Sequence, residues 1–370
     1  MDGAGICWLG PLVSLTPCLL THPRPARANP GSPARSIKSI SDLDKRRNTF
    51  FRMQIATPSY LFLFFVPLIL LLIKSILPTN SVMSKPLAHA SIVARRSSER
   101  GYAEHGGWLK SFHTFSFASY YDHRFNNFGS LRVLNEDRVA ARNGFPTHPH
   151  RDAEIFSYIL NGELTHRDSM IKKGAEGAQG KQFYRMKRGD VQFTTGGTGI
   201  AHSEQNESNK PVHFLQIWAL PWKYGLKPQY HTRTFDEAAK RKAFVPILSP
   251  LAAGPEATPA DEEAAVPKIP DTIPIHADFV MGAGIIEPGQ KFQWTVGAGE
   301  DVVSRKKKRN VYVHLPMTKN GKAQIRLDHR DEAVLSEGDG AFITGVNAGD
   351  VLSVESVGDA EAEVIVLDSD

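Results

Sequence analysis

Residues 144–154 read GFPTHPHRDAE, and in this stretch one residue separates His148 from His150. Side chains of an extended strand alternate between its two faces, so both imidazoles of such a pair lie on one face and can bind one metal ion. Later in the chain, residues 197–206 read GTGIAHSEQN, and there His202 and Glu204 share a face for the same reason. The two segments predict two strands that together present three imidazoles and one carboxylate to a metal.

This donor set contains nitrogen and oxygen but no thiolate, which suits Fe(II), Mn, Ni, Cu or Zn. Glu154, four residues after His150, is an alternative carboxylate ligand, or else a hydrogen-bond partner of a ligand histidine. His166 is predicted to lie next to the site or to pack in the core. Three further histidines are predicted to line the core or a barrel wall, namely His113, His213 and His314.

The sequence around these segments predicts an all-β fold. Short apolar runs end at turn dipeptides, as at 154–160 before Asn161-Gly162 and at 190–195 before Gly196-Gly197. Such spacing is typical of a β-sandwich or β-barrel. The dipeptide Gly-Asp precedes an apolar run twice, at 189–190 and at 338–339, which indicates an internal repeat of one barrel unit.

The first 82 residues differ from the rest and form a leader. Its segment 55–77 is predicted to be a membrane-spanning helix, because 55–73 contains no charge and 60–73 is strongly apolar. A signal peptide that starts at Met53 and a mitochondrial presequence over 22–52 are the alternatives. Translation that starts at Met83 instead would give a cytoplasmic or nuclear protein.

The positive charge belongs to this leader. The whole chain carries +5, whereas residues 1–82 alone carry +6 and residues 83–370 carry −1. A body so close to neutral is not expected to bind nucleic acid directly. The basic run at 305–309 is predicted to be a solvated loop before a strand at 311–315, with a nuclear-localisation signal as the alternative. Two cysteines are too few for a disulfide scaffold or a cysteine-rich zinc domain.

Residues 105–170, which begin HGGWLKSFHTF, closely resemble the pirin family of the cupin superfamily, as do 189–208 and VHFLQIWALPW at 212–222. The resemblance is nearest to the quercetin 2,3-dioxygenase-like branch. It implies a bicupin, in which two stacked jelly-roll β-barrels form one chain. The domains would be a metal-binding cupin at 91–246, a linker or insertion at 249–270 and a metal-free cupin at 271–370.

The family's ligand positions fall on His148, His150, His202 and Glu204, which implies one iron in the first barrel. The implied function is an Fe(II)-dependent dioxygenase, monomeric in its catalytic body, that opens a flavonol-like aromatic ring with O₂. Glu204 would also take the substrate's hydroxyl proton as a general base. Candidates for the apolar wall of the site are Phe145, Phe193 and Phe214.

Two other functions are compatible with this sequence. One is an iron-dependent transcriptional co-regulator that binds a protein partner without catalysis. The other is a structural cupin with an idle metal site, because a fold alone does not define a function.

Overall fold

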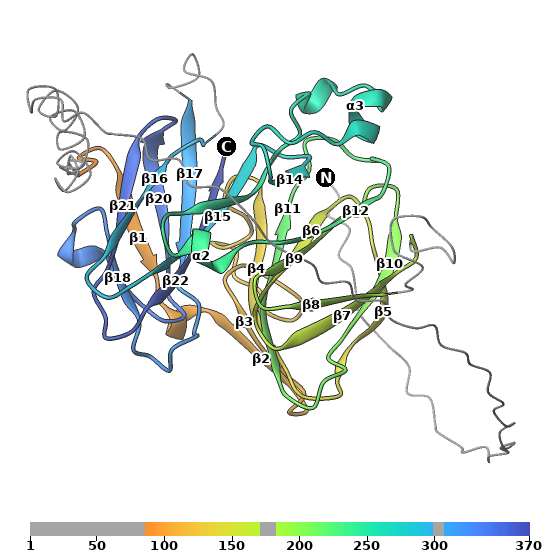
Figure 1. Cartoon of the computed structure of the whole chain (residues 1–370), viewed down its shortest axis with the longest axis horizontal. Helices are drawn as coiled ribbons and strands as arrows, with labels where there is room; N and C mark the ends of the chain where they lie inside the picture. Colours follow the sequence, from red (N-terminus) through yellow and green to blue (C-terminus); the bar gives the residue numbers. More distant parts are fainter. Residues whose placement is uncertain (1–85, 171–182, 299–306) are drawn as a thin grey trace, which may run out of the picture. The chain divides into compact units, whose positions relative to one another are not determined.

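Strands dominate the part of the chain that the computed structural model describes, which is residues 86–170, 183–298 and 307–370 (Figure 1). They form two halves, and each half contains one seven-stranded sheet and one four-stranded sheet. Helices are few and short. The predicted all-β fold is confirmed.

The first half is built from two facing sheets. Its seven-stranded sheet contains, in spatial order, β12 (Gln229–Thr234), β9 (Asp190–Thr195), β6 (Glu154–Asn161), β11 (Val212–Ala219), β4 (Leu131–Val139), β3 (Leu109–His113) and β2 (Gly101–His105). Its four-stranded sheet contains β5 (Gly144–His150), β10 (Ile200–Gln205), β7 (Glu163–Asp168) and β8 (Tyr184–Lys187). Hydrogen bonds from Ser157 on β6 and Gln216 on β11 to Glu204 on β10 join the two sheets across the interior.

The second half repeats this strand order. Its larger sheet contains β1 (Ser91–Arg95), β20 (Gly340–Asn347), β17 (Lys308–His314), β22 (Ala362–Ser369), β15 (Phe279–Ile286), β13 (Val245–Pro250) and β14 (Ile273–Ile275). Its smaller sheet contains β16 (Lys291–Thr295), β21 (Val351–Ser356), β18 (Gln324–Leu327) and β19 (Val334–Ser336). The predicted internal repeat is confirmed, because β9 and β20, which follow the two Gly-Asp dipeptides, occupy the same place in their sheets.

The aspartates of the two Gly-Asp dipeptides accept equivalent pairs of hydrogen bonds. Asp190 accepts hydrogen bonds from the backbone N–H of Lys187, at 2.9 Å, and from the hydroxyl of Thr234, at 2.6 Å. Asp339 accepts from the backbone N–H of Ser336, at 3.1 Å, and from that of Ser97, at 2.7 Å. Each aspartate therefore closes the turn before its strand, and it also binds the neighbouring edge strand at its last residue, Thr234, or two residues beyond its end, at Ser97.

Both ends of the predicted first domain, 91–246, pair with the second half. Strand β1 runs antiparallel to β20, and in Figure 1 it is the orange strand among the blue ones. Strand β13 pairs with β14 and β15. Alternation along one short strand does not reveal which sheet edge will receive it, so the sequence could not fix these two pairings.

The segment predicted as a linker, 249–270, is ordered. It begins within β13, where Ser249 and Pro250 are buried, and continues into the exposed helix α3 (Pro259–Ala264). Thr258 caps this helix in a capping box with Asp261, and Pro259 occupies its first turn.

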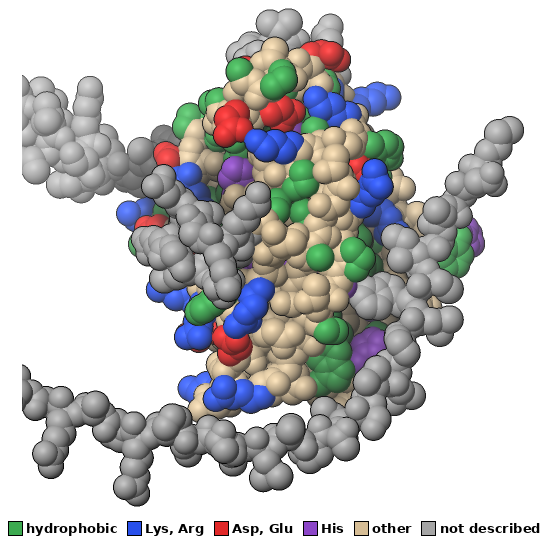
Figure 2. Space-filling model, turned by 90° about the vertical axis from the view of Figure 1, so that its right-hand side faces the viewer, with side chains coloured by type: hydrophobic (Ala, Val, Ile, Leu, Met, Phe, Trp, Pro, Cys, Tyr) green, Lys and Arg blue, Asp and Glu red, His purple; other side chains and the backbone are tan. Residues whose placement is uncertain are grey.

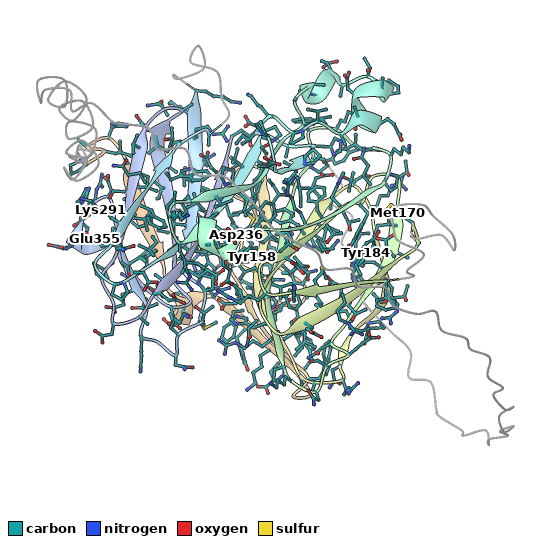
Figure 3. All side chains as sticks on the ribbon, viewed as in Figure 1. Tyr158, Met170, Tyr184, Asp236, Lys291 and Glu355 are labelled. Atoms are coloured by element: carbon teal, nitrogen blue, oxygen red, sulfur yellow. The ribbon has the colours of Figure 1, made fainter. Side chains whose placement is uncertain are left out.

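The two larger sheets share one apolar core. Phe156 and Phe193 of the first half belong to the same buried cluster as Phe279 of the second. At the edge of this core the hydroxyl of Tyr158 donates to Glu363, at 2.6 Å, and the ammonium of Lys240 donates to the Tyr158 oxygen, at 2.9 Å. Tyr158 is labelled in Figure 3 close to Asp236, the N-cap of the short helix α2 (Glu237–Lys240).

A buried carboxylate also joins the halves. Glu136 on β4 contacts Arg100 at 3.2 Å, His213 at 2.8 Å and His314 of the second half at 3.1 Å, and it accepts from the backbone N–H of Met317. Burial acts to raise the pKa of Glu136, but the hydrogen bonds from His213 and His314, together with the charges of His314 and Arg100, outweigh it and hold the pKa well below its usual range. His213 and His314 are thus strand residues with hydrogen-bond partners, as predicted.

The charged groups of the surface are mixed. Basic and acidic side chains are interspersed on the face shown in Figure 2, as expected for a nearly neutral body. Within the run 305–309, the prediction of a solvated loop is wrong for Arg309. This residue lies on β17, is buried, and is paired with Asp278 and Asp368.

No helix among residues 86–170, 183–298 and 307–370 is long and apolar enough to cross a membrane. The leader 1–82, with its predicted span at 55–77, lies outside the described residues.

Candidate metal centre

The H-x-H segment forms β5, the edge strand of the smaller sheet in the first half. Pro146 and Pro149 lack a backbone N–H, which an edge strand tolerates because one of its sides has no partner. His148 pairs with His202 on β10 in the register of the two strands. The alternation of β5 places His148 and His150 on one face of the sheet, as predicted, and it is the face that also carries the cross-strand partner His202.

Three imidazoles converge at this place. One ligand atom each of His148, His150 and His202 lies within 4.8 Å of the others. The ring centroids are 4.6 to 4.7 Å apart, and the Nε2 atoms of His148 and His202 are separated by 3.0 Å. Nδ1 of His148 donates to the carbonyl oxygen of Pro146, at 2.7 Å, which leaves the lone pair on Nε2.

The surroundings keep the rings of His150 and His202 neutral. Burial lowers the pKa of His150 to about 3, and the neighbouring rings of His148 and His166 lower it further. The pKa of His202 is depressed more strongly, again chiefly by burial. The buried Nε2 of His150 has no hydrogen-bond partner among the described residues. Imidazoles whose ring nitrogens converge, two of them kept neutral by burial, suit a divalent transition metal, so these residues fit such an ion.

Glu204 lies on the same face of β10, two residues beyond His202, and both side chains are buried. Its carboxylate oxygens accept hydrogen bonds from Ser157, at 3.1 Å, and from Gln216, at 3.2 Å. It is not among the side chains whose ligand atoms lie within 4.8 Å of all three histidines. The structure therefore groups three of the four predicted ligands, and ligation by Glu204 stays a prediction.

Glu154 does not lie at this site. Its carboxylate accepts from the hydroxyl of Thr195, at 3.2 Å, and contacts His276 of the second half, at 3.3 Å. It shares a face of β6 with Phe156, which belongs to the core between the halves, and that face points away from the imidazoles.

A row of polar residues crosses the opposite wall of the interior. Consecutive cross-strand pairs join its members, which are His113, Asn135, Gln216, Ser157 and Gln192. We call them the polar row. Within it, Nε2 of His113, Nδ2 of Asn135 and Oε1 of Gln192 are buried without a hydrogen-bond partner among the described residues. Such atoms need water or a polar ligand as a partner.

The three phenylalanines that were predicted to form the apolar wall of the site lie in two different places. Phe214 belongs to an apolar cluster in the first half, and Phe145 packs against that cluster. Phe193 stacks on Phe156 in the core between the halves, so its assignment to the wall of the site is wrong. Because residues 190–195 are all buried, burial alone does not show which face each side chain takes.

His166 was predicted to lie next to the site or to pack in the core, whereas Asp168 was not predicted to lie near the site. One ligand atom each of His166, Asp168 and His202 lies within 4.8 Å of the others. The sequence contained a signal for this pair, because one residue separates His166 from Asp168 at the end of β7. The same spacing occurs in the two segments that were predicted to bind the metal.

The corresponding strands of the second half carry different side chains. Strands β16 and β21 turn Phe292, Trp294, Leu352 and Val354 into an apolar core. None of these four side chains can ligate a metal. That the whole second half binds no metal stays a prediction.

Comparison with known proteins now identifies the family. The profile of the pirin family matches residues 94–219. A Zymomonas mobilis protein, named provisionally as a quercetin 2,3-dioxygenase, is 36% identical over 74% of this chain and 97% of its own length. The Escherichia coli K12 protein named quercetin 2,3-dioxygenase is 44% identical over 43% of this chain, and the match spans 63% of that protein. The chain belongs to the pirin family.

Solved structures agree with this assignment. The crystal structure of YhhW from Escherichia coli matches 76% of this chain with a TM-score of 0.58 and 30% identity. The structure of the same bacterial pirin in complex with nickel(II) matches 75% of this chain with a TM-score of 0.57 and 29% identity. The fold is therefore all-β and cupin-like, as predicted.

Proposed function

We propose that this protein is a metal-dependent dioxygenase that acts on a flavonol-like, quercetin-type aromatic substrate. The observation that carries the proposal is the convergence of three imidazoles opposite a polar row with unpartnered hydrogen-bonding atoms. The names of the relatives from Escherichia coli and Zymomonas mobilis support the same reaction class.

The proposed cofactor is Fe(II), with Mn, Ni, Cu and Zn as alternatives. The nickel(II) complex of the related bacterial pirin supports a metal at this kind of site. His148, His150 and His202 would hold the ion, joined by Glu204. When bound, the metal would supply Lewis-acid and redox chemistry toward the substrate's oxygens and O₂.

The protein's own groups would bind the substrate and take up its proton. Ser157 and Gln216 both donate to Glu204, and two donors suit an ionised carboxylate, the form that acts as a base. Glu204 would accept the proton of the substrate's hydroxyl group. Asn135 and Gln192 of the polar row would hydrogen-bond the hydroxyl and keto groups, and Phe145 and Phe214 would contact the ring edge.

Metal analysis and turnover of the full-length protein test this function. The wild type should retain close to one transition-metal ion per chain and consume O₂ with release of carbon monoxide when quercetin is added. His150→Ala should lose the metal, and the exposed His123→Ala serves as the matched control. Glu204→Gln should lower turnover about 10²- to 10⁴-fold, the usual contribution of a general base.

Two results would contradict the proposal. Wild-type protein that retains none of the five metals has no metal centre of this kind. Protein that retains metal but shows no O₂ uptake with quercetin is not a dioxygenase for this substrate, and the non-catalytic co-regulator then becomes the better explanation.

A further inference from the structure

Strand β7 presents a histidine and an aspartate, two residue types that can bind metals, beside the metal centre. His166 and Asp168 alternate on β7 as His148 and His150 do on β5. In the register of β7 and β10, Asp168 lies directly opposite His202, and His166 lies opposite Glu204. His148, His202 and Asp168 therefore form one row across three neighbouring strands.

The Asp168 side chain is held rigidly. Its Oδ1 accepts the backbone N–H of Met170, at 2.7 Å, and its Oδ2 lies 3.3 Å from Nε2 of His166. The side chains of His166 and Asp168 are fully buried. In Figure 3, Met170 and Tyr184 are labelled beside each other at this end of the first half.

His166 is in turn packed between aromatic rings. Its ring meets that of His202 edge to face, with centroids 5.0 Å apart, and it packs on Tyr230 at the same centroid distance. Tyr230 stacks on Tyr184 at 4.6 Å. The His166–Asp168 pair is thus packed tightly beside His202.

The position of the proton on His202 assigns a role to Asp168. Nε2 of His202 points at Nε2 of His148, so a metal bound there requires the remaining proton of His202 on Nδ1. That Nδ1 is buried and has no hydrogen-bond partner among the described residues. A carboxylate is the acceptor that ligand histidines commonly use, and a buried carboxylate needs further donors.

We propose that Asp168, held by His166, is the positioning residue of the metal centre. Its carboxylate is the nearby group that can accept the Nδ1–H of His202, a hydrogen bond that the structure itself does not contain. Once formed, this bond would fix both the tautomer and the ring orientation that place Nε2 at the metal. The inference rests on the proposed function only in that a metal binds the three histidines. It does not depend on the reaction or the substrate.

Metal affinity of the full-length chain provides the first test. Asp168→Asn keeps an oxygen for the N–H of Met170 but removes the charge. It should weaken Ni(II) and Fe(II) binding by about 10- to 100-fold, as is usual when such partners are lost. Glu163→Gln is the matched control, because it removes an exposed carboxylate from the same strand and should leave affinity unchanged.

A spectroscopic measurement separates positioning from a merely structural role. In the Co(II)-substituted protein the ligand-field absorption should shift in Asp168→Asn and return toward the wild-type spectrum in Asp168→Glu. His166→Asn should produce a smaller shift, and it remains a test if Asp168→Asn does not fold. The melting temperature of each metal-free variant shows whether folding is intact.

The two proposals fail differently. Wild-type protein that binds no metal would overturn the metal centre itself. Wild-type protein that binds metal would overturn the role of Asp168 alone if folded Asp168→Asn, or folded His166→Asn in its place, matches it in affinity and in Co(II) spectrum.

Discussion

Asp137 is a buried acid on the interior face of β4, two residues from Asn135 of the polar row. Burial raises the pKa of Asp137 to about 7, against a hydrogen bond donated by Ser111, and the charge of Glu204 raises it further. The folded protein therefore holds this proton up to near-neutral pH, whereas the unfolded chain releases it near 3.8. The stability gained from the neutral carboxyl is complete below 3.8 and is lost as the pH rises to about 7.

We therefore expect Asp137→Asn to gain stability over the wild type as the pH rises through this window, by on the order of a few kcal/mol above pH 7. The amide keeps an acceptor for Ser111 and cannot ionise. Urea unfolding of the metal-free proteins between pH 4.5 and 8 measures the difference, with the exposed Asp359→Asn as control. A difference that does not change with pH would contradict the assignment.

Individual site residues were predictable from the sequence where two signals coincide. His148, His150 and His202 were found because one-residue spacing beside glycine-rich turns already indicates a strand face. Asp168 was missed although its segment follows the Asn161-Gly162 turn, because only the pairing of β7 with β10 brings it opposite His202, and the sequence does not show that pairing. The position of Glu154 was not predictable, because the sequence does not show which alternate residues of β6 face the metal centre. A shift of one residue moves a side chain to the other face of the sheet.

The two Gly-Asp turns are equivalent elements with equivalent contacts. We expect Asp190→Ala to free the end of β12, and Asp339→Ala to free the end of β1, each at a cost of about 1–3 kcal/mol for the N–H group left without its acceptor. Hydrogen exchange should accelerate over 229–234 in the first variant and over 91–95 in the second. Each variant is the control for the other, and acceleration over both strands in either variant would argue against this local role.

Most strands were predictable as elements because apolar runs end at turns, as at Asn161-Gly162. Partners of edge strands were not predictable, because β1 has exposed residues and its register with β20 is fixed only by the finished sheet. The sequences of β16 and β21 contain no H-x-H segment, and apolar residues occupy their interior positions instead.

At the scale of the whole molecule, Glu136 connects groups from both halves. Because its pKa is held low, its contribution to stability is present above the unfolded pKa near 4.5 and is lost as the pH falls. We expect Glu136→Gln to cost about 3–5 kcal/mol at pH 7, since Arg100 would lose its buried partner. Calorimetry of the full-length protein should show the main transition at a lower temperature, with the loss shrinking below pH 4.5. An unchanged transition would show that the halves are held by their shared apolar core alone.

The place of β1 has a consequence for synthesis on the ribosome. This strand emerges before every other described strand, but its partner β20 emerges near the end of translation. The first half has all its strands once β12 has been made, whereas β1 stays unpaired until the second half forms. A nascent chain therefore carries an unpaired strand for most of its elongation, and a chaperone that recognises extended segments has its longest opportunity there.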